Sequence, residues 1–356
     1  MAITKISIPA FLEWRKTIPV FDVRSPGEYE QAHVPGAYSF ALFSDEERKE
    51  IGTAYKQVSR ETAVEIGLGF FKEKMMPLIE KAKSLKGQND NKIMVHCWRG
   101  GMRSTAVAWL LDLYGFEVYV LDGGYKSFRR WALSILEIKY SCNVLGGYTG
   151  SGKTEILQQF IQKNHAVINL EGLANHQGSA FGNLHNIPQP RQEMFENLLA
   201  DALWNTQQSA HKVFWIEDES RRIGSLNIPA ALYESMRAAT IYFMDIPFEE
   251  RLKYILNNYG QYTHEQLQDA ILRIQKRLGG LETKMAIEYL HKGDLEKCFS
   301  ILLRYYDRCY LKNLPNRENI SAQLHTIQSF TTDASLNASL LENTIQKKEQ
   351  DDNRRK

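Results

Sequence analysis

The sequence predicts an α/β fold of two successive parallel-sheet domains, the second of which continues into a helical part. Short apolar segments alternate with helical segments in both halves of the chain. Each half also carries a glycine-containing loop directly after an apolar segment, at residues 97–101 and 147–152. Because 356 residues exceed the usual size of one domain, we expect domains at 1–138 and 139–330, followed by a frayed or disordered polar tail at 331–356.

The first half reads as strands and helices in alternation. Residues 20–23, 93–96 and 118–121 are short apolar segments with the length of buried strands. Residues 26–31 form a helical turn, and residues 104–113 form a helix directly after the first glycine-containing loop. Strands that are joined through helices imply a parallel sheet.

The second half repeats this organisation and then changes. We expect strands at 143–145, 212–216 and 240–244 and an amphipathic helix at 155–163. From about residue 247 to 308 the pattern is helical, because Ile271, Ile274 and Leu278 fall on one face with charged residues opposite.

The composition is that of a soluble globular protein, with 43% hydrophobic and 24% charged residues. Neither a membrane-spanning run nor a signal-peptide pattern is present, so we expect a cytoplasmic protein with no membrane partner. Four scattered cysteines predict neither a disulfide framework nor a zinc site. A net charge of +2 does not by itself indicate a nucleic-acid partner, so a polyanion must bind local basic clusters, such as those at 126–130, 221–222 and 273–277.

Cys97 opens the first loop and is the candidate nucleophile. It follows an apolar strand, precedes a helix, and has Arg99 and Arg103 close by in sequence. Loop amides, a helix N-terminus and guanidinium groups all favour a thiolate over a thiol. We therefore predict catalytic roles for Cys97, Arg99 and Arg103.

The second loop fits G-x-x-x-x-G-K-[ST] at every fixed position. In such a loop the backbone amides surround phosphate oxygens, the lysine supplies a positive charge and the hydroxyl residue can hold magnesium. The predicted phosphate-binding residues are Gly147, Gly150, Ser151, Gly152, Lys153 and Thr154, with Thr154 as the candidate Mg²⁺ ligand. The acidic end of the strand at 212–216, residues 217–219, could supply a metal partner. The motif fits a diphosphate ester as well as a nucleotide.

Two interpretations of Cys97 compete. Five residues separate Cys97 from Arg103, which is the spacing of cysteine-dependent phosphatases, where the arginine grips the phosphate. However, residues 22–29, 33–37 and 121–125 resemble the signature segments of rhodanese domains. That resemblance implies a loop cysteine that carries sulfur or selenium, although some phosphatases share the rhodanese fold.

The fusion of a rhodanese-like domain to a P-loop domain resembles the tRNA 2-selenouridine synthases. The resemblance extends from Asp22 to Gly224 and includes 51–57, 97–104, 123–126, 170–174, 178–182, 195–197 and 217–224. Gln177 departs from the family pattern, in which we expect arginine.

This resemblance implies a selenotransferase that acts on tRNA carrying 2-thiouridine at the wobble position. Selenium would come from selenophosphate, made by a separate supply enzyme, and would replace the sulfur after its S-geranylation from geranyl diphosphate. Both small molecules are substrates, and no tightly bound cofactor is implied; Mg²⁺ could bind beside the diphosphate. Cys97 would carry selenium, and the loop around Lys153 would bind the diphosphate.

Further residues are candidates for the substrate site. Trp98 could stack on a base or cover the geranyl chain, but a hydrophobic lid explains it equally well. For His96 we expect a packed, hydrogen-bonded side chain, and for Asp22 and Arg24 a bracing charged pair. The complete candidate set is Trp98, Glu171, His176, Ser179, Phe181, Glu217, Asp218 and Arg221.

Two other functions stay open from the residues alone. One is a rhodanese-fold cysteine phosphatase fused to a kinase-like P-loop domain. The other is a regulatory protein without catalysis, in which one domain senses redox state and the other binds a nucleotide. Arg99, Gly100, Gly101 and Arg103 argue against an inactive loop, because such a loop has no need of an anion cradle.

Overall fold

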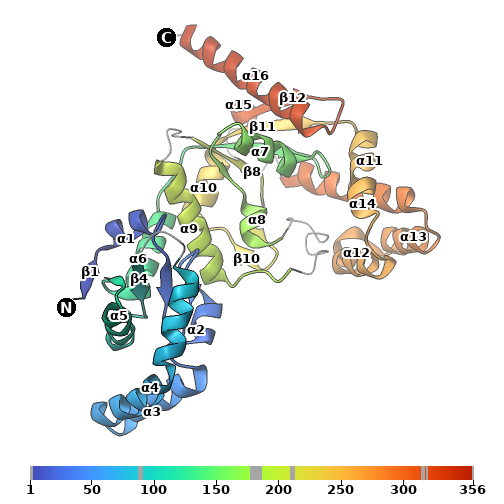
Figure 1. The fold of residues 1–356 in the computed structure, drawn as a ribbon. Coiled ribbons are helices and arrows are strands. Elements are labelled where there is room, and N and C mark those ends of the chain that lie inside the picture. The colour runs from blue at the N-terminus through green and yellow to red at the C-terminus, as the bar shows by residue number, and fades with distance from the viewer. Residues whose placement is uncertain are drawn as a thin grey trace. The chain divides into compact units, whose positions relative to one another are not determined.

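The computed structural model describes residues 3–86, 91–176, 187–208, 213–313, 317 and 320–354. The chain divides into two compact units (Figure 1). The first comprises Met1–Ile135 and Glu196–Asp201, and the second comprises Leu136–Phe195 and Ala202–Lys356. The main division therefore lies at residues 135/136, whereas the sequence interpretation placed it at 138/139.

The first unit contains a five-stranded parallel sheet. Its strands are ordered β1 (Thr4–Ile6), β5 (Glu117–Leu121), β4 (Lys92–His96), β2 (Val20–Asp22) and β3 (Tyr38–Ser39). Strand β4 lies at the centre, where Val95 pairs with Val120 on one side and Phe21 on the other. Because parallel strands end at the same edge, Cys97 emerges at the carboxyl edge of the sheet.

Among the described residues, six helices of this unit pack around or beside the sheet. They are α1 (Ile8–Trp14), α2 (Pro26–Gln31), α3 (Asp45–Gln57), α4 (Arg60–Leu85), α5 (Met102–Tyr114) and α6 (Gly124–Leu136). Ser44 starts α3 with a capping box, in which its side chain accepts from the Glu47 amide. Phe21, Val95 and Leu111 are among the core residues that α5 and the sheet bury.

The short stretch Glu196–Asp201 belongs to the first unit although it lies far along the chain. It is part of helix α9 (Gln192–Gln208). Asn197 is fully buried there, and its amide donates to the His33 carbonyl at 3.0 Å and to the Tyr125 hydroxyl at 2.9 Å.

The second unit contains another five-stranded parallel sheet. Its order is β12 (Leu324–Gln328), β11 (Thr240–Asp245), β6 (Cys142–Gly147), β8 (Phe214–Glu217) and β7 (Val167–Ile168). After β6 the chain builds β7 and β8 on one side and β11 and β12 on the other. The loop after β6 therefore lies at the switch point of the sheet, where α/β proteins bind ligands. A small hairpin, β9 (Arg222–Ile223) with β10 (Leu226–Asn227), stands apart.

The helices of this unit fall into two groups. Those near the sheet are α7 (Lys153–Gln162), α8 (Leu170–Ala174), α9, α10 (Ala230–Ala238), α15 (Ile320–Gln323) and α16 (Ala334–Arg354). The helical part comprises α11 (Phe248–Tyr259), α12 (His264–Leu278), α13 (Gly280–His291) and α14 (Leu295–Asn313). Ile271, Ile274 and Leu278 lie in its core, as their spacing predicted.

The tail prediction is wrong for the described residues, because α16 is a helix that packs on the sheet domain. Ala338 and Leu341 are fully buried in one core cluster with Ile156 and Phe160 of α7. Their spacing, with Ala334 and Ile345 on either side, places a narrow apolar stripe on one face of a mostly polar helix. The sequence analysis missed this stripe because most residues of the segment are polar.

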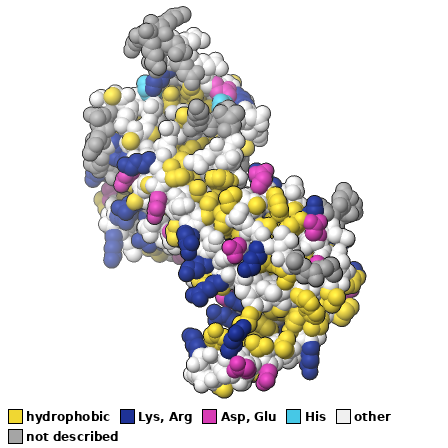
Figure 2. Space-filling model, turned by 90° about the vertical axis from the view of Figure 1, so that its left-hand side faces the viewer, with side chains coloured by type: hydrophobic (Ala, Val, Ile, Leu, Met, Phe, Trp, Pro, Cys, Tyr) yellow, Lys and Arg dark blue, Asp and Glu magenta, His cyan; other side chains and the backbone are white. Residues whose placement is uncertain are grey.

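Within the described residues no helix is both long and apolar enough to cross a membrane. The surface drawn in Figure 2 carries lysine and arginine side chains interspersed with acidic and hydrophobic ones. This mixture agrees with the small net charge of the chain.

Two candidate sites, a cysteine loop and a phosphate-binding loop

Cys97 lies in a loop that surrounds its sulfur with donors. The side chain is 4% exposed. The Gly101 amide donates to Sγ at 3.3 Å, and the hydroxyl of buried Ser104 lies 3.3 Å from Sγ. Both donors belong to the junction of the loop with α5, so the start of this helix faces the sulfur as the sequence predicted.

The pKa of the Cys97 thiol lies below its ordinary value of 9.0. Burial acts to raise this pKa, but hydrogen bonds outweigh it. They come from the Ser104 side chain and backbone and from the Arg99 backbone, and the charge of Arg103 adds to them. The loop therefore stabilises a thiolate.

Arg103 is already held by a carboxylate. Its Nη1 donates to Glu28 Oε2 at 2.6 Å, and Arg48 Nε lies 3.3 Å from the same oxygen. Arg99, in contrast, is exposed in the loop. Arg103 thus supplies a fixed charge beside the thiolate, while Arg99 is accessible to an incoming anion.

Gly124 allows the start of helix α6 to pack directly against the backbone of the cysteine loop. The amides of Tyr125 and Lys126 donate to the carbonyls of Cys97 and Trp98 at 2.8 and 3.0 Å. Gly124 has a φ of +59°, and a Cβ at this position would lie 2.4 Å from the Cys97 carbonyl oxygen. Only glycine permits this approach.

A buried charged pair braces the loop, as the sequence predicted. Arg24 Nη2 donates to Asp22 Oδ2 at 2.6 Å, and the guanidinium stacks over the Tyr125 ring at 3.8 Å. Burial acts to raise the pKa of Asp22. The charges of His96 and Arg24 together have a larger, opposite effect, so the pKa of Asp22 lies below its ordinary value. His96 is fully buried, yet neither ring nitrogen has a hydrogen-bond partner among the described residues, so the expected hydrogen bond is absent.

Trp98 lies on the outer side of the loop. It is 40% exposed, and its ring is tilted against Tyr125 at 5.6 Å between centroids. Its position agrees with a stacking role as well as with a lid.

The second loop has the backbone of a phosphate cradle. Gly147, Gly150 and Gly152 have φ values of +149°, +83° and +70°, which residues with a side chain rarely adopt. Ser151 is buried and donates from Oγ to the Tyr148 carbonyl at 2.7 Å. Lys153 Nζ donates to the Gly147 carbonyl at 3.3 Å, so its charge lies over the loop.

Three glutamates gather beside this loop. Thr154 Oγ1 donates to Glu171 Oε2 at 3.2 Å. One carboxylate oxygen each from Glu171, Glu217 and Glu219 lies within 4.8 Å of the others. Glu171 comes from α8 after β7, and the other two come from the end of β8.

Asp218 lies elsewhere than the sequence suggested. It accepts a hydrogen bond from the Tyr310 hydroxyl at 2.8 Å and forms an ion pair with Arg317. Because side chains alternate along an extended chain, Glu217 and Glu219 share one side and Asp218 takes the other. The sequence analysis named residues 217–219 as a possible metal partner but did not include Glu219 among the substrate-site candidates, although this alternation pointed to it.

Burial, together with the proximity of the other carboxylates, raises the pKa of all three glutamates above the ordinary value of 4.5. Burial, followed by the charges of Glu217 and Glu219, raises the pKa of Glu171 to about 9. Burial and the charge of Glu217 raise the pKa of Glu219 to about 7. The pKa of Glu217 is also raised, chiefly by burial, although the charge of Lys153 opposes this.

Of the four remaining candidates, the structure describes His176 and Arg221. His176 follows α8, its amide donates to the Glu171 carbonyl at 3.0 Å, and its Nδ1 is buried without a partner among the described residues. Burial and the charge of Arg273 lower the pKa of this histidine. Arg221 is exposed just before β9. Ser179 and Phe181 lie outside the described residues.

The fold and the two loops define a rhodanese-like domain with a thiolate-stabilising cysteine loop, fused to a P-loop domain with a helical part. Comparison with family models agrees. The rhodanese-like domain model matches residues 10–130, and the tRNA 2-selenouridine synthase AAA domain model matches residues 140–328.

Curated relatives give the same result over most of the chain. A tRNA 2-selenouridine synthase of Hydrogenovibrio crunogenus is 38% identical over 285 residues, which cover 74% of this chain and 77% of the relative. One from Shewanella woodyi is 32% identical over 332 residues, covering 84% and 89%. The chain therefore belongs to the tRNA 2-selenouridine synthase family.

A solved structure is also similar to part of the chain. It is the N-terminal domain of a putative ATP/GTP binding protein from Clostridium difficile 630, which is 34% identical. The match covers 37% of this chain and 99% of that one, with a TM-score of 0.34.

Proposed function

We propose that this chain is a transferase that replaces the sulfur of wobble 2-thiouridine in tRNA with selenium from selenophosphate, after S-geranylation from geranyl diphosphate. The observation that carries the proposal is the presence of two anion-stabilising loops in one chain whose relatives are named tRNA 2-selenouridine synthase. One loop lowers the pKa of its cysteine thiol, and the other has the backbone geometry of a phosphate-binding loop. The proposed substrates place the reaction in the cytoplasm, with a separate enzyme supplying selenophosphate.

The phosphate loop suits the geranylation step. A bond forms between the thiouridine sulfur and the allylic carbon, the bond from that carbon to the diphosphate oxygen breaks, and the diphosphate leaves with the electron pair. The loop amides and Lys153 would stabilise its growing charge. The base loses its N3 proton in this step.

The residues beside the loop fit a magnesium ion. Thr154 offers a hydroxyl, and the three glutamates offer carboxylate oxygens, the donor type that Mg²⁺ prefers. Glu217 Oε1 is buried and has no hydrogen-bond partner among the described residues, which leaves it free to bind a cation. When bound, the ion would add positive charge beside the departing diphosphate.

The cysteine loop suits the selenium step. Selenophosphate supplies selenium at the selenide level: this selenium bonds to C2 of the base, the bond from C2 to the geranylthio sulfur breaks, and geranylthiolate leaves with the electron pair. Water cleaves the bond from selenium to phosphorus and phosphate is released. Cys97 would deliver the selenium to C2 from its loop as an anion, without a change of oxidation level. The Gly101 amide and the Ser104 hydroxyl would stabilise the charge. Exposed Arg99 would attract selenophosphate, which is itself an anion.

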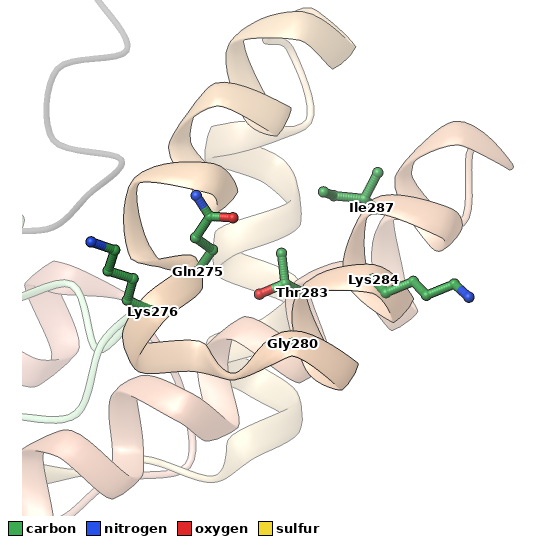
Figure 3. Close-up of a pocket in the computed structure, with 6 residues that line it drawn as sticks. All are labelled: Gln275, Lys276, Gly280, Thr283, Lys284 and Ile287. Atoms are coloured by element: carbon green, nitrogen blue, oxygen red, sulfur yellow. The ribbon is translucent and has the colours of Figure 1, made fainter.

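The helical part offers a surface for the tRNA backbone. A hollow of about 650 Å³ lies between α12 and α13, with Lys276 and Lys284 on opposite sides of it (Figure 3). Gln275 and Thr283 add polar groups between them. These two lysines would offer positive charges to the phosphates, although the charge of Lys284 also acts on Glu288, one turn further along α13.

The deciding experiment is incubation with thiolated tRNA, geranyl diphosphate and selenophosphate, followed by mass analysis of the nucleosides. The proposal predicts both S-geranylated and selenated uridine. If neither forms, it is wrong. Hydrolysis of a phosphate ester that requires Cys97 and Arg103 would instead favour a cysteine phosphatase.

The proposed tRNA surface has a test of its own. Lys276→Glu should weaken tRNA binding and reduce its salt dependence, whereas Lys253→Glu on α11 should do neither.

A further inference from the structure

Arg251 of α11 is a buried arginine whose side chain reaches the phosphate loop. It is 3% exposed. Its Nη1 donates to the carbonyl of Thr149, in the middle of the loop, at 3.0 Å. Its Nε donates to the carbonyl of Ile246, directly after β11, also at 3.0 Å. One guanidinium therefore connects the phosphate loop to the end of the strand that pairs with β6.

Asp307 of α14 holds this guanidinium in place. Its two carboxylate oxygens accept from Nη1 at 2.9 Å and from Nη2 at 2.8 Å. Such a two-pronged contact fixes the plane of the guanidinium as well as its distance. Helices α11 and α14 lie side by side in the helical part (Figure 1). Because its charge is balanced, the buried arginine can donate to a backbone carbonyl without leaving an unpaired charge in the interior.

Helix α11 also fills the space on one side of the phosphate loop. A Cβ on Gly150 would lie 3.0 Å from both the Arg251 carbonyl oxygen and Ile255 Cδ1. A Cβ on Gly152 would lie 3.9 Å from the Tyr254 ring. Residues three and four apart share one face of a helix, so a single face of α11 packs on the loop. This side of the loop is occupied by protein, which leaves the other side for an anion.

The orientation of one peptide group links Arg251 to phosphate binding. In a trans peptide the carbonyl and the following amide point in opposite directions. Because the Thr149 carbonyl points to Arg251, the Gly150 amide points away from α11, to the side that is left for an anion. A carbonyl in its place would repel a phosphate. Gly150, with a φ of +83°, tolerates either sign of φ, so the hydrogen bond from Arg251 is needed to prevent rotation of this peptide.

We propose that Arg251, oriented by Asp307, is a positioning residue that holds the 149–150 peptide of the phosphate loop in the orientation that binds a diphosphate. It acts through the loop backbone and not by contact with the diphosphate. The inference rests on the proposed function, in which this loop binds the diphosphate, and it adds two residues of the helical part to that site.

The test is calorimetric titration of the full chain with inorganic diphosphate in the presence of Mg²⁺. Arg251→Lys keeps the positive charge, but lysine ends one bond short of Nη1 and has no planar fork. We expect diphosphate binding to weaken by about tenfold or more, because a hydrogen bond from a charged group to the loop is lost. The net charge of the chain is unchanged in this variant.

Asp307→Asn separates positioning from charge. If the pair positions the loop, this variant should also weaken diphosphate binding, by roughly threefold or more, because the guanidinium loses its second prong. An effect of charge alone would have the opposite sign, since removal of a negative charge favours an anion. Tighter binding in Asp307→Asn, or binding like the parent in Arg251→Lys, would overturn the proposal.

Leu290→Ala controls for a general loss of stability. Leu290 lies on α13 and is fully buried in the core of the helical part. Its variant should unfold at a lower temperature than the parent but bind diphosphate equally well. If it weakened diphosphate binding as much as Arg251→Lys does, stability and not loop orientation would explain both results, and the proposal would be wrong.

Hydrogen exchange without any ligand distinguishes failure of this inference from failure of the proposed function. The Ser151 amide donates to the Tyr148 carbonyl at 3.2 Å within the loop. Its exchange should be about fivefold faster or more in Arg251→Lys than in the parent, and unchanged in Leu290→Ala. Unchanged exchange in Arg251→Lys would overturn the role of Arg251. If exchange responds as expected but the parent binds no diphosphate, Arg251 does hold the loop and the diphosphate site of the proposed function is wrong.

Discussion

Arg103 in the first turn of α5 donates a 2.6 Å hydrogen bond to Glu28 of α2, and this ion pair fixes a positive charge beside the Cys97 thiolate. Burial acts to raise the pKa of Glu28, but the hydrogen bond and charge of Arg103 lower it below its ordinary value. The arginine that the phosphatase spacing singled out therefore has a structural partner in the resting protein. It acts on the sulfur from a fixed position.

Arg103→Met should raise the pKa of the Cys97 thiol, because the positive charge that favours the thiolate is lost. Alkylation of Cys97 by iodoacetamide should then slow several-fold at pH 7, and its pH profile should move to higher pH. Glu28→Gln is the control, since it keeps the guanidinium charge and should not move the profile upward. Equal upward shifts in both variants would show that loop geometry, and not the charge, sets this pKa.

Different substitutions should block geranylation and selenation separately. Cys97→Ala should abolish selenation while sparing geranylation, because the sulfur is needed only to carry selenium. Lys153→Ala should reduce geranylation first, by about 10²-fold or more, because it removes a charge that stabilises the leaving diphosphate. Mass analysis of tRNA nucleosides distinguishes the products. Selenation that persists in Cys97→Ala would rule out the carrier role.

Gly124→Ala should destabilise the first unit by roughly 2–4 kcal/mol. The new Cβ would lie 2.4 Å from the Cys97 carbonyl oxygen, at a φ of +59° that disfavours any side chain. Gly101→Ala is the matched control in the same loop, because its Cβ would meet nothing within 4 Å and its φ is −103°. We expect it to cost less than about 1 kcal/mol. Urea unfolding compares the two, and similar losses would contradict the predicted contact.

Leu341→Ala should cost about 2–4 kcal/mol of the stability of the second unit, because it leaves a cavity between α16 and α7. Leu336→Ala on the same helix should have little effect, since Leu336 is 62% exposed. Chemical unfolding followed by circular dichroism measures both. If Leu341→Ala were as mild as Leu336→Ala, the terminal helix would not be packed in solution.

Without a divalent cation, the second unit should lose stability as the pH rises. The pKa of Glu171 in the folded state, about 9, exceeds the ordinary value of 4.5. Such a group contributes fully to stability below pH 4.5, and its contribution is lost progressively up to about pH 9. Glu171→Gln removes this loss, so its stability advantage over the parent should grow between pH 5 and 9 in EDTA. An advantage that is constant with pH would contradict the raised pKa.

Much of the fold could be predicted because its signals are local. The apolar strands before Cys97 and Gly147 and the helices after them were placed within a few residues, since each depends on its own periodicity and turn residues. Asn197 could not be assigned to the first unit from its neighbours, because its burial depends on His33 and Tyr125, far away in sequence.

The sequence by itself determined the two loops, the α/β class with its helical part, and the family. A thiolate loop and a phosphate cradle are each encoded by a few consecutive residues, whose backbone geometry makes the site. Only the tertiary structure decided which acidic residues share the phosphate loop. Glu171 and Glu219 join Glu217 because two strand ends converge at one edge of the sheet, while Asp218 turns to Arg317 on the other side of its strand.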